Sequence, residues 1–208
     1  MTELLGVDVA SFQGLPAQWR AAAGHISYVA VKLTELEPPS AAYPNGNHYV
    51  NPDAKADWAY AKSRGYGRIA YLYGHPATSP AETVDLFCSV LVQLGLEDGD
   101  GIMLDHEWTD GLSPAKVSAW AVDVMGRLAK RLARTPLLYT YLNFAETANC
   151  TGLGGYPLAI SDPSSPPGHP RIPPPWRRWA IHQYATGGAI DRDIANFTDL
   201  AAMRFASW

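Results

Sequence analysis

Cysteine is scarce in this chain of 208 residues, and its two cysteines, Cys88 and Cys150, lie far apart in the sequence. Two thiols at this spacing exclude a disulfide-stapled scaffold and a cysteine-ligated zinc site. Long hydrophobic runs are also lacking, since no apolar stretch approaches the roughly 20 residues of a membrane-spanning helix. We therefore expect no insertion into a membrane.

Positive charge is not in excess either. The 16 basic residues against 20 acidic ones leave a net charge of −4, which argues against a nucleic-acid partner. Residues 1–9 contain no basic cluster followed by an apolar segment, so we expect no secretory signal. Phosphate-binding Gly-rich loops are absent, and the six histidines lack metal-ligand spacing. The sequence therefore predicts neither a metal nor a cofactor.

Apolar and aromatic residues are what the chain does contain. Hydrophobic residues make up 47% of it and charged residues 17%, which suffices for the core of a single domain spanning residues 1–208. The unusual feature is the aromatic content, with 7 Trp and 11 Tyr. This number of rings raises the question of what they bind.

Short apolar and β-branched runs predict strands. Most are continuous rather than alternating, which is typical of parallel strands covered on both faces. The runs are Leu4–Val9, Ile26–Leu33, Ile69–Tyr73, Ile102–Asp105, Pro136–Tyr141, Pro157–Ile160 and Trp179–Tyr184. Helical patterns follow the first five, over Pro16–Ala23, Asn51–Ser63, Ser79–Leu94, Val117–Leu132 and Asn143–Ala148.

This strand–helix alternation predicts an α/β fold with a parallel sheet and right-handed crossovers. Residues 157–197 contain strand-like pieces with no helix between them, and the seven prolines of Pro163–Pro175 predict a stiff surface loop. These features favour a barrel-like sheet with five helices and a helix-poor closing segment. A doubly wound open sheet remains the alternative.

Two acidic residues stand two positions apart where a strand ends, in the segment Gly101–Glu107. Because alternate side chains of a strand share a face, Asp105 and Glu107 are expected to project together, with His106 pointing the other way. This edge of a parallel α/β sheet carries the active site. Paired carboxylates in an apolar surround suit acid–base cleavage of a glycosidic bond. A helix cap and a solvated charge are the alternative interpretation.

Other acids lie at comparable strand ends. Asp8 ends the first predicted strand and Asp191 lies near the last one. A closed barrel brings its first and last strands together, so both side chains are expected to face one cavity. For Glu35 and Asp193 we favour a structural role in a turn or salt bridge.

Six aromatic residues fall at or near the same strand ends: Tyr71, Tyr73, Trp108, Tyr139, Tyr141 and Tyr184. Aromatic faces stack on the C–H faces of sugars, and their polar edges meet hydroxyl groups. We therefore predict that these six residues bind sugar. Trp58, Trp120 and Trp179 are interpreted as core residues, and Cys88 as a buried, inert thiol.

Together these segments resemble the glycoside hydrolase family 25 lysozymes of the Chalaropsis type. The resemblance covers nearly the whole chain, in the right order. It rests on Gly6–Gly14, Tyr28–Glu35, Ile69–Pro76, Asp105–Glu107, Pro136–Thr140, His182–Tyr184 and Ile190–Asp191.

The resemblance implies a TIM-like β/α barrel with five βα units followed by three further strands. It also implies an N-acetylmuramidase that cleaves the β-1,4 bond between N-acetylmuramic acid and N-acetylglucosamine in peptidoglycan. By position, Glu107 resembles the general acid. Asp105 resembles the carboxylate that assists the substrate's 2-acetamido group or stabilises the oxocarbenium-like state. Asp8 and Asp191 match the family's other active-site acids, and Gln183 is an expected substrate contact.

From the same resemblance we expect a monomer that acts on the bacterial wall, as a bacteriophage endolysin or as part of a virion. Three positions depart from the family pattern, which has Gly, His and Ser where this chain has Leu36, Leu72 and Ala10. These differences concern specificity and leave the acids intact. Two other functions stay open: a non-catalytic wall-binding or virion structural barrel, and a hydrolase of another glycan.

Overall fold

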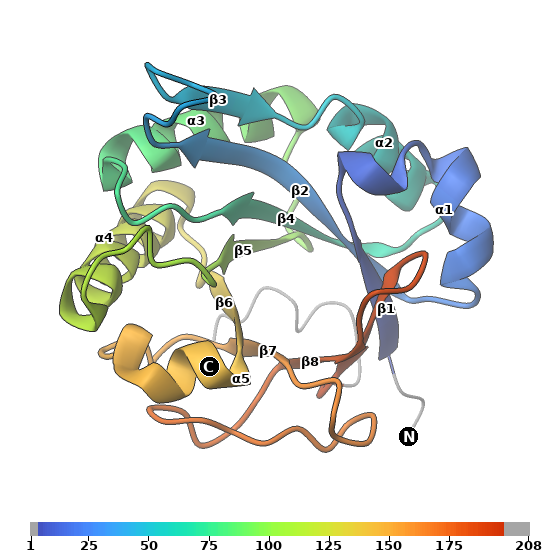
Figure 1. Ribbon diagram of the computed structural model, residues 1–208. Coiled ribbons are helices and arrows are strands. Elements are labelled where there is room, and N and C mark those ends of the chain that lie inside the picture. Colours follow the sequence, from blue (N-terminus) through green and yellow to red (C-terminus); the bar gives the residue numbers. More distant parts are fainter. Residues whose placement is uncertain (1–3, 198–208) are drawn as a thin grey trace.

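The computed structural model describes residues 4–197 and folds them around one nine-stranded sheet (Figure 1). The strands are β1 (Leu4–Val9), β2 (Tyr28–Glu37), β3 (Asn47–Val50), β4 (Gly67–Tyr73), β5 (Gly101–Asp105), β6 (Leu137–Tyr141), β7 (Leu158–Ser161), β8 (Ile181–Ala185) and β9 (Asp191–Ala195). Their order is β1-β9-β8-β7-β6-β5-β4-β2-β3, and β1 also pairs with β2. This pairing closes eight strands into a barrel and leaves β3 as an extra strand at its edge.

Helices cover the outside of the ring of strands (Figure 1). They are α1 (Pro16–Ala23), α2 (Ala54–Ser63), α3 (Pro80–Leu94), α4 (Pro114–Leu132) and the short α5 (Leu142–Phe144), which continues into a π-helical turn over Ala145–Asn149. One helix thus follows each of β1, β2, β4, β5 and β6 before the next barrel strand, and none separates β7, β8 and β9. The predicted TIM-like barrel of five βα units and three further strands is confirmed, and the open sheet is excluded.

The barrel strands are buried on both faces, which explains why their sequences read as continuous apolar runs. Val29 and Val31 of β2 point outward into the core that the strands share with the helices. Tyr28 of the same strand points inward and packs with the side chains that fill the barrel. A side chain at Gly6 would place its Cβ 2.2 Å from the Tyr28 ring, so glycine is needed beside this inward tyrosine.

Strand β9 departs from the parallel pattern, because it is antiparallel to both of its neighbours, β1 and β8. Its first residues, rather than its last, therefore lie at the edge where the parallel strands end. The sequence did not predict this strand as a run, because Asp191, Arg192 and Asp193 open it with three charges. Its burial comes from the closure of the barrel and not from its own hydrophobicity.

Two local predictions are corrected. Strand β2 continues to Glu37 instead of ending at Leu33, and it forms an antiparallel hairpin with β3, whose residues are half-buried or exposed. Helix α2 begins at Ala54 and not near Asn51. The Asn51 side chain accepts the Asp53 N–H at 3.0 Å and donates to the Lys32 carbonyl at 2.8 Å, so it fastens the loop to β2.

Other predictions are confirmed. The helical pattern predicted over Ser79–Leu94 is α3, where the Ser79 side chain accepts the Glu82 N–H at 3.4 Å and Gly95, with a φ of 76°, follows the last residue. Cys88 is buried in the core, as are Trp58 and Trp120, and Trp179 packs partly buried against it. No helix within residues 4–197 is both long and apolar enough to cross a membrane.

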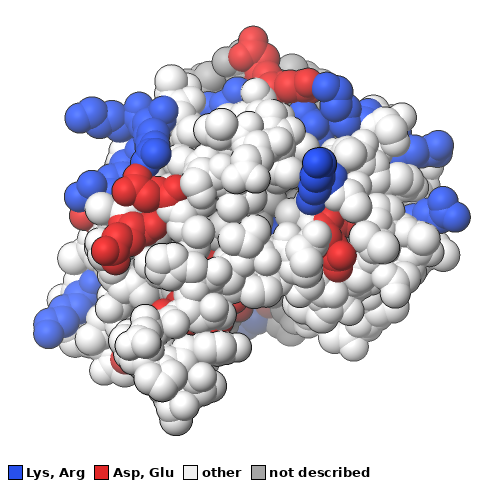
Figure 2. Space-filling view, turned by 90° about the horizontal axis from the view of Figure 1, so that it is seen from above, with Lys and Arg blue, Asp and Glu red and all other residues white. Residues whose placement is uncertain are grey.

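The molecule is shown from above the β3 side of the barrel in Figure 2. Lys and Arg lie near Asp and Glu around the edges of this face, and residues without charge occupy its middle. The predicted site acids Asp8, Asp105, Glu107 and Asp191 lie instead around a cavity at the mouth of the barrel.

Candidate active site

A cavity of about 160 Å³ opens where the parallel strands of the barrel end. Five acidic side chains line it, together with Lys32, Gln183 and three tyrosines. The deeper wall is apolar and includes Met103 and Ile181. The cavity therefore places several carboxylates in surroundings with little water, which is how active sites shift protonation equilibria.

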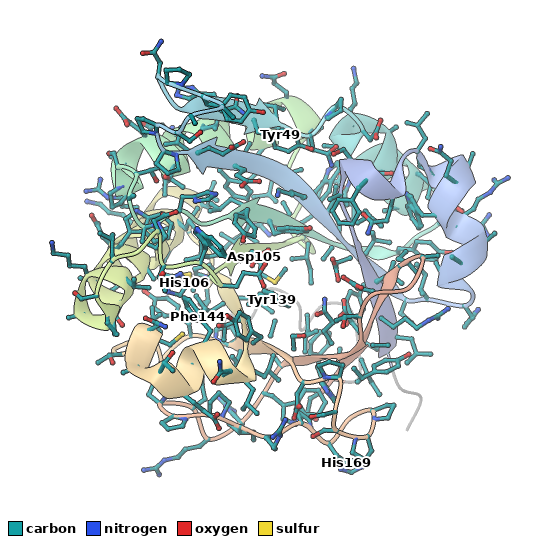
Figure 3. All side chains as sticks on the ribbon, viewed as in Figure 1. Tyr49, Asp105, His106, Tyr139, Phe144 and His169 are labelled. Atoms are coloured by element: carbon teal, nitrogen blue, oxygen red, sulfur yellow. The ribbon has the colours of Figure 1, made fainter. Side chains whose placement is uncertain are left out.

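Asp105 and Glu107 both line this cavity, as strand alternation predicted. His106 between them is fully buried on the outer side, where its ring lies 6.1 Å from that of Trp120 and 5.1 Å from that of Phe144. Figure 3 shows Asp105 toward the centre of the ring of strands and His106 outside it. Burial lowers the pKa of His106 to about 4, so the ring is neutral and its Nε2–H donates to the Asn149 carbonyl at 3.1 Å.

Burial raises the pKa of both carboxyl groups. For Asp105 the pKa lies well above its usual range, because the charge of Glu107 adds to the effect of burial and Lys32 only partly opposes it. For Glu107 burial is again the largest cause, opposed by a hydrogen bond from the Tyr73 hydroxyl and by the charge of Lys32. Two interacting acids in one cavity titrate as a pair, so the charge on one raises the pKa of the other.

Asp8 and Asp191 meet at the same cavity because β1 pairs with β9, with these two residues directly opposite each other. Burial and the charge of Asp191 raise the pKa of Asp8 to about 7. Burial also raises the pKa of Asp191, whose Oδ1 accepts the Gly187 N–H at 3.2 Å. The barrel closure expected from the sequence thus brings the four predicted acids together.

Gln183 links two sides of the cavity. Its amide nitrogen donates to Asp8 Oδ2 at 2.8 Å, and its amide oxygen accepts the Tyr139 hydroxyl at 2.8 Å. This chain of hydrogen bonds fixes the amide orientation and holds the aromatic ring of β6 against the acid of β1.

Asp193 corrects a prediction, because its carboxyl group lines the cavity instead of forming a salt bridge. It is buried, and burial, with the charges of Asp8 and Asp191, holds its pKa well above its usual range. Because side chains two positions apart on a strand share a face, the spacing from Asp191 could have indicated that Asp193 faces the cavity. Glu35 takes the predicted structural role, with Oε2 2.6 Å from Lys32 Nζ.

The predicted aromatic residues divide into two groups. Tyr71, Tyr73 and Tyr139 line the cavity. Trp108 is 55% exposed and Tyr141 37% exposed, and neither contributes to the cavity wall. Tyr184 does not line it either, because it alternates with Gln183 along β8, and its ring lies 6.3 Å from that of His182.

Lys32 and Phe12 were missed by the sequence analysis, although both line the cavity. Lys32 shares the inward face of β2 with Ala30, just before the register shift in the pairing with β4, so alternation alone could have found it. Phe12 lies in a single 3₁₀ turn after β1 and is 81% exposed. Among residues 4–197, no cluster of three or more His, Cys, Asp or Glu side chains has the arrangement of a metal site.

The open end of this β/α barrel holds buried, interacting carboxyl groups and aromatic rings. This combination is typical of an acid–base hydrolase of sugars. The model of the family described as glycosyl hydrolases family 25 matches residues 7–192. The chain belongs to this family, and the protein is accordingly a glycoside hydrolase. No match was found among curated proteins.

Solved structures of similar fold include a bacterial lysozyme from Streptomyces coelicolor, with a TM-score of 0.78, 24% identity and 98% of each chain covered. A muramidase from Acremonium alcalophilum has a TM-score of 0.79 at 22% identity, covering 97% of this chain and 98% of its own. A family GH25 lysozyme from Aspergillus fumigatus has a TM-score of 0.77 at 22% identity, with both chains fully covered at 100%. At these identities the likeness concerns the fold.

Proposed function

We propose that this glycoside hydrolase is a peptidoglycan hydrolase, an N-acetylmuramidase that cleaves the β-1,4 bond between N-acetylmuramic acid and N-acetylglucosamine. The observation that carries the proposal is the pair Asp105 and Glu107, which face one cavity and hold protons more tightly than free carboxyl groups do. Membership of family 25 and the folds shared with lysozymes and muramidases support this substrate.

Glu107 is proposed as the general acid that protonates the leaving glycosidic oxygen. Burial raises its pKa, which favours the protonated form that a general acid needs, and the Tyr73 hydroxyl stabilises the carboxylate that forms when the proton has left. Burial raises the pKa of Glu107, and the hydrogen bond to its charged form lowers it. Together they allow the group to donate a proton without holding it too tightly.

Asp105 is proposed as the second carboxylate, which orients the 2-acetamido group of the substrate or stabilises the oxocarbenium-like state. Its Oδ1 atom is buried without a hydrogen-bond partner among the described residues. An unpaired buried carboxylate oxygen is costly unless a bound molecule satisfies it, and the acetamido N–H is a donor of the right kind.

The remaining residues are proposed to bind the sugar. Tyr71 and Tyr139 offer ring faces and hydroxyl groups to it inside the cavity, and Gln183 orients Tyr139 toward Asp8. Trp108 and Tyr141, exposed beyond the cavity, stay predicted contacts for a longer glycan strand. Tyr184 is not included, because its position on β8 does not reach the cavity wall.

We further propose that the protein acts on the bacterial wall as a monomer with one catalytic domain. One closed barrel contains eight of the nine described strands, and β3 pairs with β2 at its edge, which supports the single domain. Release as a bacteriophage endolysin, or carriage by a virion, stays a prediction.

The test is an assay on purified bacterial walls with the wild type and with Glu107→Gln. We expect the wild type to release new reducing ends and Glu107→Gln to be slower by about 10²–10⁴-fold, which is the typical contribution of a general acid. The matched control is Glu146→Gln, an exposed acid in the turn after α5, which should behave as the wild type.

The products distinguish the alternatives. Release of free amines without reducing ends would indicate an amidase or peptidase and contradict the proposal. Binding to walls whose glycan stays intact would indicate a non-catalytic barrel. Reducing ends produced equally by Glu107→Gln would leave the enzyme a glycosidase but remove Glu107 from its proposed role.

A further inference from the structure

Four charged side chains form a row that leads from the loop after β5 to the wall of the cavity. Asp110 Oδ1 lies 2.8 Å from His75 Nδ1, and Glu35 Oε1 lies 2.8 Å from Nε2 of the same ring. The other oxygen of Glu35 lies 2.6 Å from Lys32 Nζ. Lys32 ends the row at the cavity, so charges outside the site are connected with the carboxyl groups inside it.

His75 is the centre of this row. Burial lowers the pKa of its ring, but hydrogen bonds to Glu35 and Asp110 outweigh burial and raise it above its usual value. An imidazole flanked by two carboxylates donates from both nitrogens and is positively charged. Asp110 is held in turn by the Ala77 N–H at 2.9 Å, which fixes the far end of the row.

The row bends around the ring of Tyr73. Lys32 Nζ lies 4.6 Å from the centre of this ring, which belongs to β4. The centre of the His75 ring lies 5.4 Å from the centre of the Tyr73 ring. Lys32 also lies 5.5 Å from the ring of Tyr49, whose hydroxyl is 2.6 Å from Ser11 Oγ. Two aromatic faces and one carboxylate therefore define the position of the ammonium group.

The position of Lys32 matters because its charge acts on the two proposed catalytic groups. It lowers the pKa of Glu107 and that of Asp105, against the effect of burial. Glu35 has the opposite sign and raises the pKa of Asp105. The pKa values of Asp105 and Glu107 thus depend on how completely the charge of Glu35 is neutralised by His75.

We propose that His75 is a positioning residue for the reaction: clamped between Glu35 and Asp110, it holds the Lys32 ammonium against the pair Asp105 and Glu107 and neutralises Glu35 there. The inference rests on the proposed function for its kinetic readout alone. His75 touches no substrate in this role. It acts through charge and position.

The charges that face each group determine the sign of the effect. His75 is faced by Glu35 from β2, by Asp110 from the loop after β5, and by the Tyr73 ring from β4. Around Glu107 the groups that act on its charge are Lys32 of β2, Tyr73 of β4, Asp8 of β1, Asp105 of β5 and Asp191 of β9. None of the variants below removes a group from this second set.

His75→Gln removes one positive charge, so Glu107 should hold its proton to higher pH. The alkaline limb of the profile of kcat/KM against pH is expected to move up by roughly half a unit. Glu35→Gln removes one negative charge and should move the limb down by a similar amount. The double variant loses one charge of each sign and should return the limb to near the wild-type position.

The experiment measures kcat and KM from pH 4 to 9 on soluble peptidoglycan fragments, with thermal unfolding as the check on folding. We expect kcat to fall in His75→Gln by about 10-fold, with KM changed less than 2-fold, as for a residue that does not touch substrate. The matched control is His169→Gln, because His169 is exposed on the proline-rich loop, away from Asp105 in Figure 3.

A second readout does not depend on turnover. The ¹³C carboxyl resonance of Glu107, followed through a pH titration, should report the same opposite shifts in the two single variants. Shifts of the same sign in His75→Gln and Glu35→Gln, or a limb that stays in place in both, would overturn the proposal. If the wild type releases no reducing ends, the muramidase assignment fails, while the carboxyl titration still tests the role of His75.

Discussion

Asp57 of α2 accepts the indole N–H of Trp19 from α1 at 2.9 Å, and its other carboxylate oxygen is buried without a partner among the described residues. Burial raises the pKa of Asp57 to about 6, although the hydrogen bond from Trp19 opposes the shift. The residue lies between two helices and far along the chain from the acids of the cavity. It illustrates that a raised pKa by itself does not mark an active site, since packing between helices produces one too.

Asp57→Asn is expected to remove a pH-dependent loss of stability. The folded protein holds the Asp57 proton more tightly than the unfolded chain, so the free energy of unfolding falls as the pH rises from about 4 to about 6. An asparagine keeps the acceptor for Trp19 and does not titrate. The free energy of unfolding of the variant, taken relative to that of the wild type, should therefore be about 2 kcal/mol higher at pH 7.5 than at pH 4.5.

Chemical denaturation at the two pH values measures this gain. Asp123→Asn, in which an exposed acid of α4 is changed, is the control for replacing an acid by its amide. An equal difference at both pH values for Asp57→Asn would show that Asp57 is ionised throughout.

The site residues that the sequence revealed are those governed by local rules. Asp105 and Glu107 follow from two-residue alternation after an apolar run, and the outward position of His106 follows from the same rule. Asp193 was assigned to a turn or salt bridge, whereas closure of the barrel buries its side chain. Lys32 was missed although the same alternation places it with Ala30 on the inward face of β2, where it lines the cavity.

At the scale of elements, the proline-rich segment between β7 and β8 is held by one carboxylate. Asp162 accepts hydrogen bonds from Ser164 and Ser165, and from the backbone and guanidinium of Arg171. These donors hold the pKa of Asp162 well below its usual range, with Arg171 as the largest cause. A segment without helix or strand thus obtains its order from side-chain acceptors instead of backbone ladders.

Asp162→Ala should therefore loosen this segment. Several donors lose their acceptor at once, and we expect a loss of about 2 kcal/mol in the free energy of unfolding. Hydrogen exchange should accelerate at the Arg171 amide, which bonds to Asp162 directly. Ser165→Ala removes one donor and is the milder control. Unchanged exchange at Arg171 would mean that the prolines alone order the segment.

Prediction of the elements succeeded where apolar periodicity defines them and failed where it does not. Helix α4 and strands β4 and β5 bury whole apolar faces, so their patterns are complete in the sequence. Strand β3 presents only half-buried and exposed residues, and β9 begins with charges. β3 is a strand because it pairs with the preceding β2, and β9 because it pairs with β8 and with the distant β1, so neither strand has a complete apolar pattern of its own.

At the scale of the whole molecule, barrel closure gathers Asp8, Asp105, Glu107, Asp191 and Asp193 around one cavity, and burial raises the pKa of each. Buried acids whose pKa values are raised make folding take up protons. Stability is then present at low pH and is lost as the pH rises through the folded-state pKa values. His75 acts in the same direction, because its pKa is raised and its favourable charge is lost at high pH.

The molecule should consequently be more stable at pH 5 than at pH 8, and Asp8→Asn should weaken that dependence. The pKa of Asp8 is raised to about 7, so its cost develops between pH 4 and 7, whereas an asparagine there still accepts the amide of Gln183 without bearing a charge. At pH 8 the variant is expected to exceed the wild type in stability by about 1 kcal/mol while losing activity, as active-site acids trade stability for function. Melting temperatures and reducing-end release, measured together at both pH values, test this expectation. A wild type equally stable at pH 5 and pH 8 would mean that the buried acids already share their protons through water or counter-ions, and that closing the barrel carries no electrostatic cost.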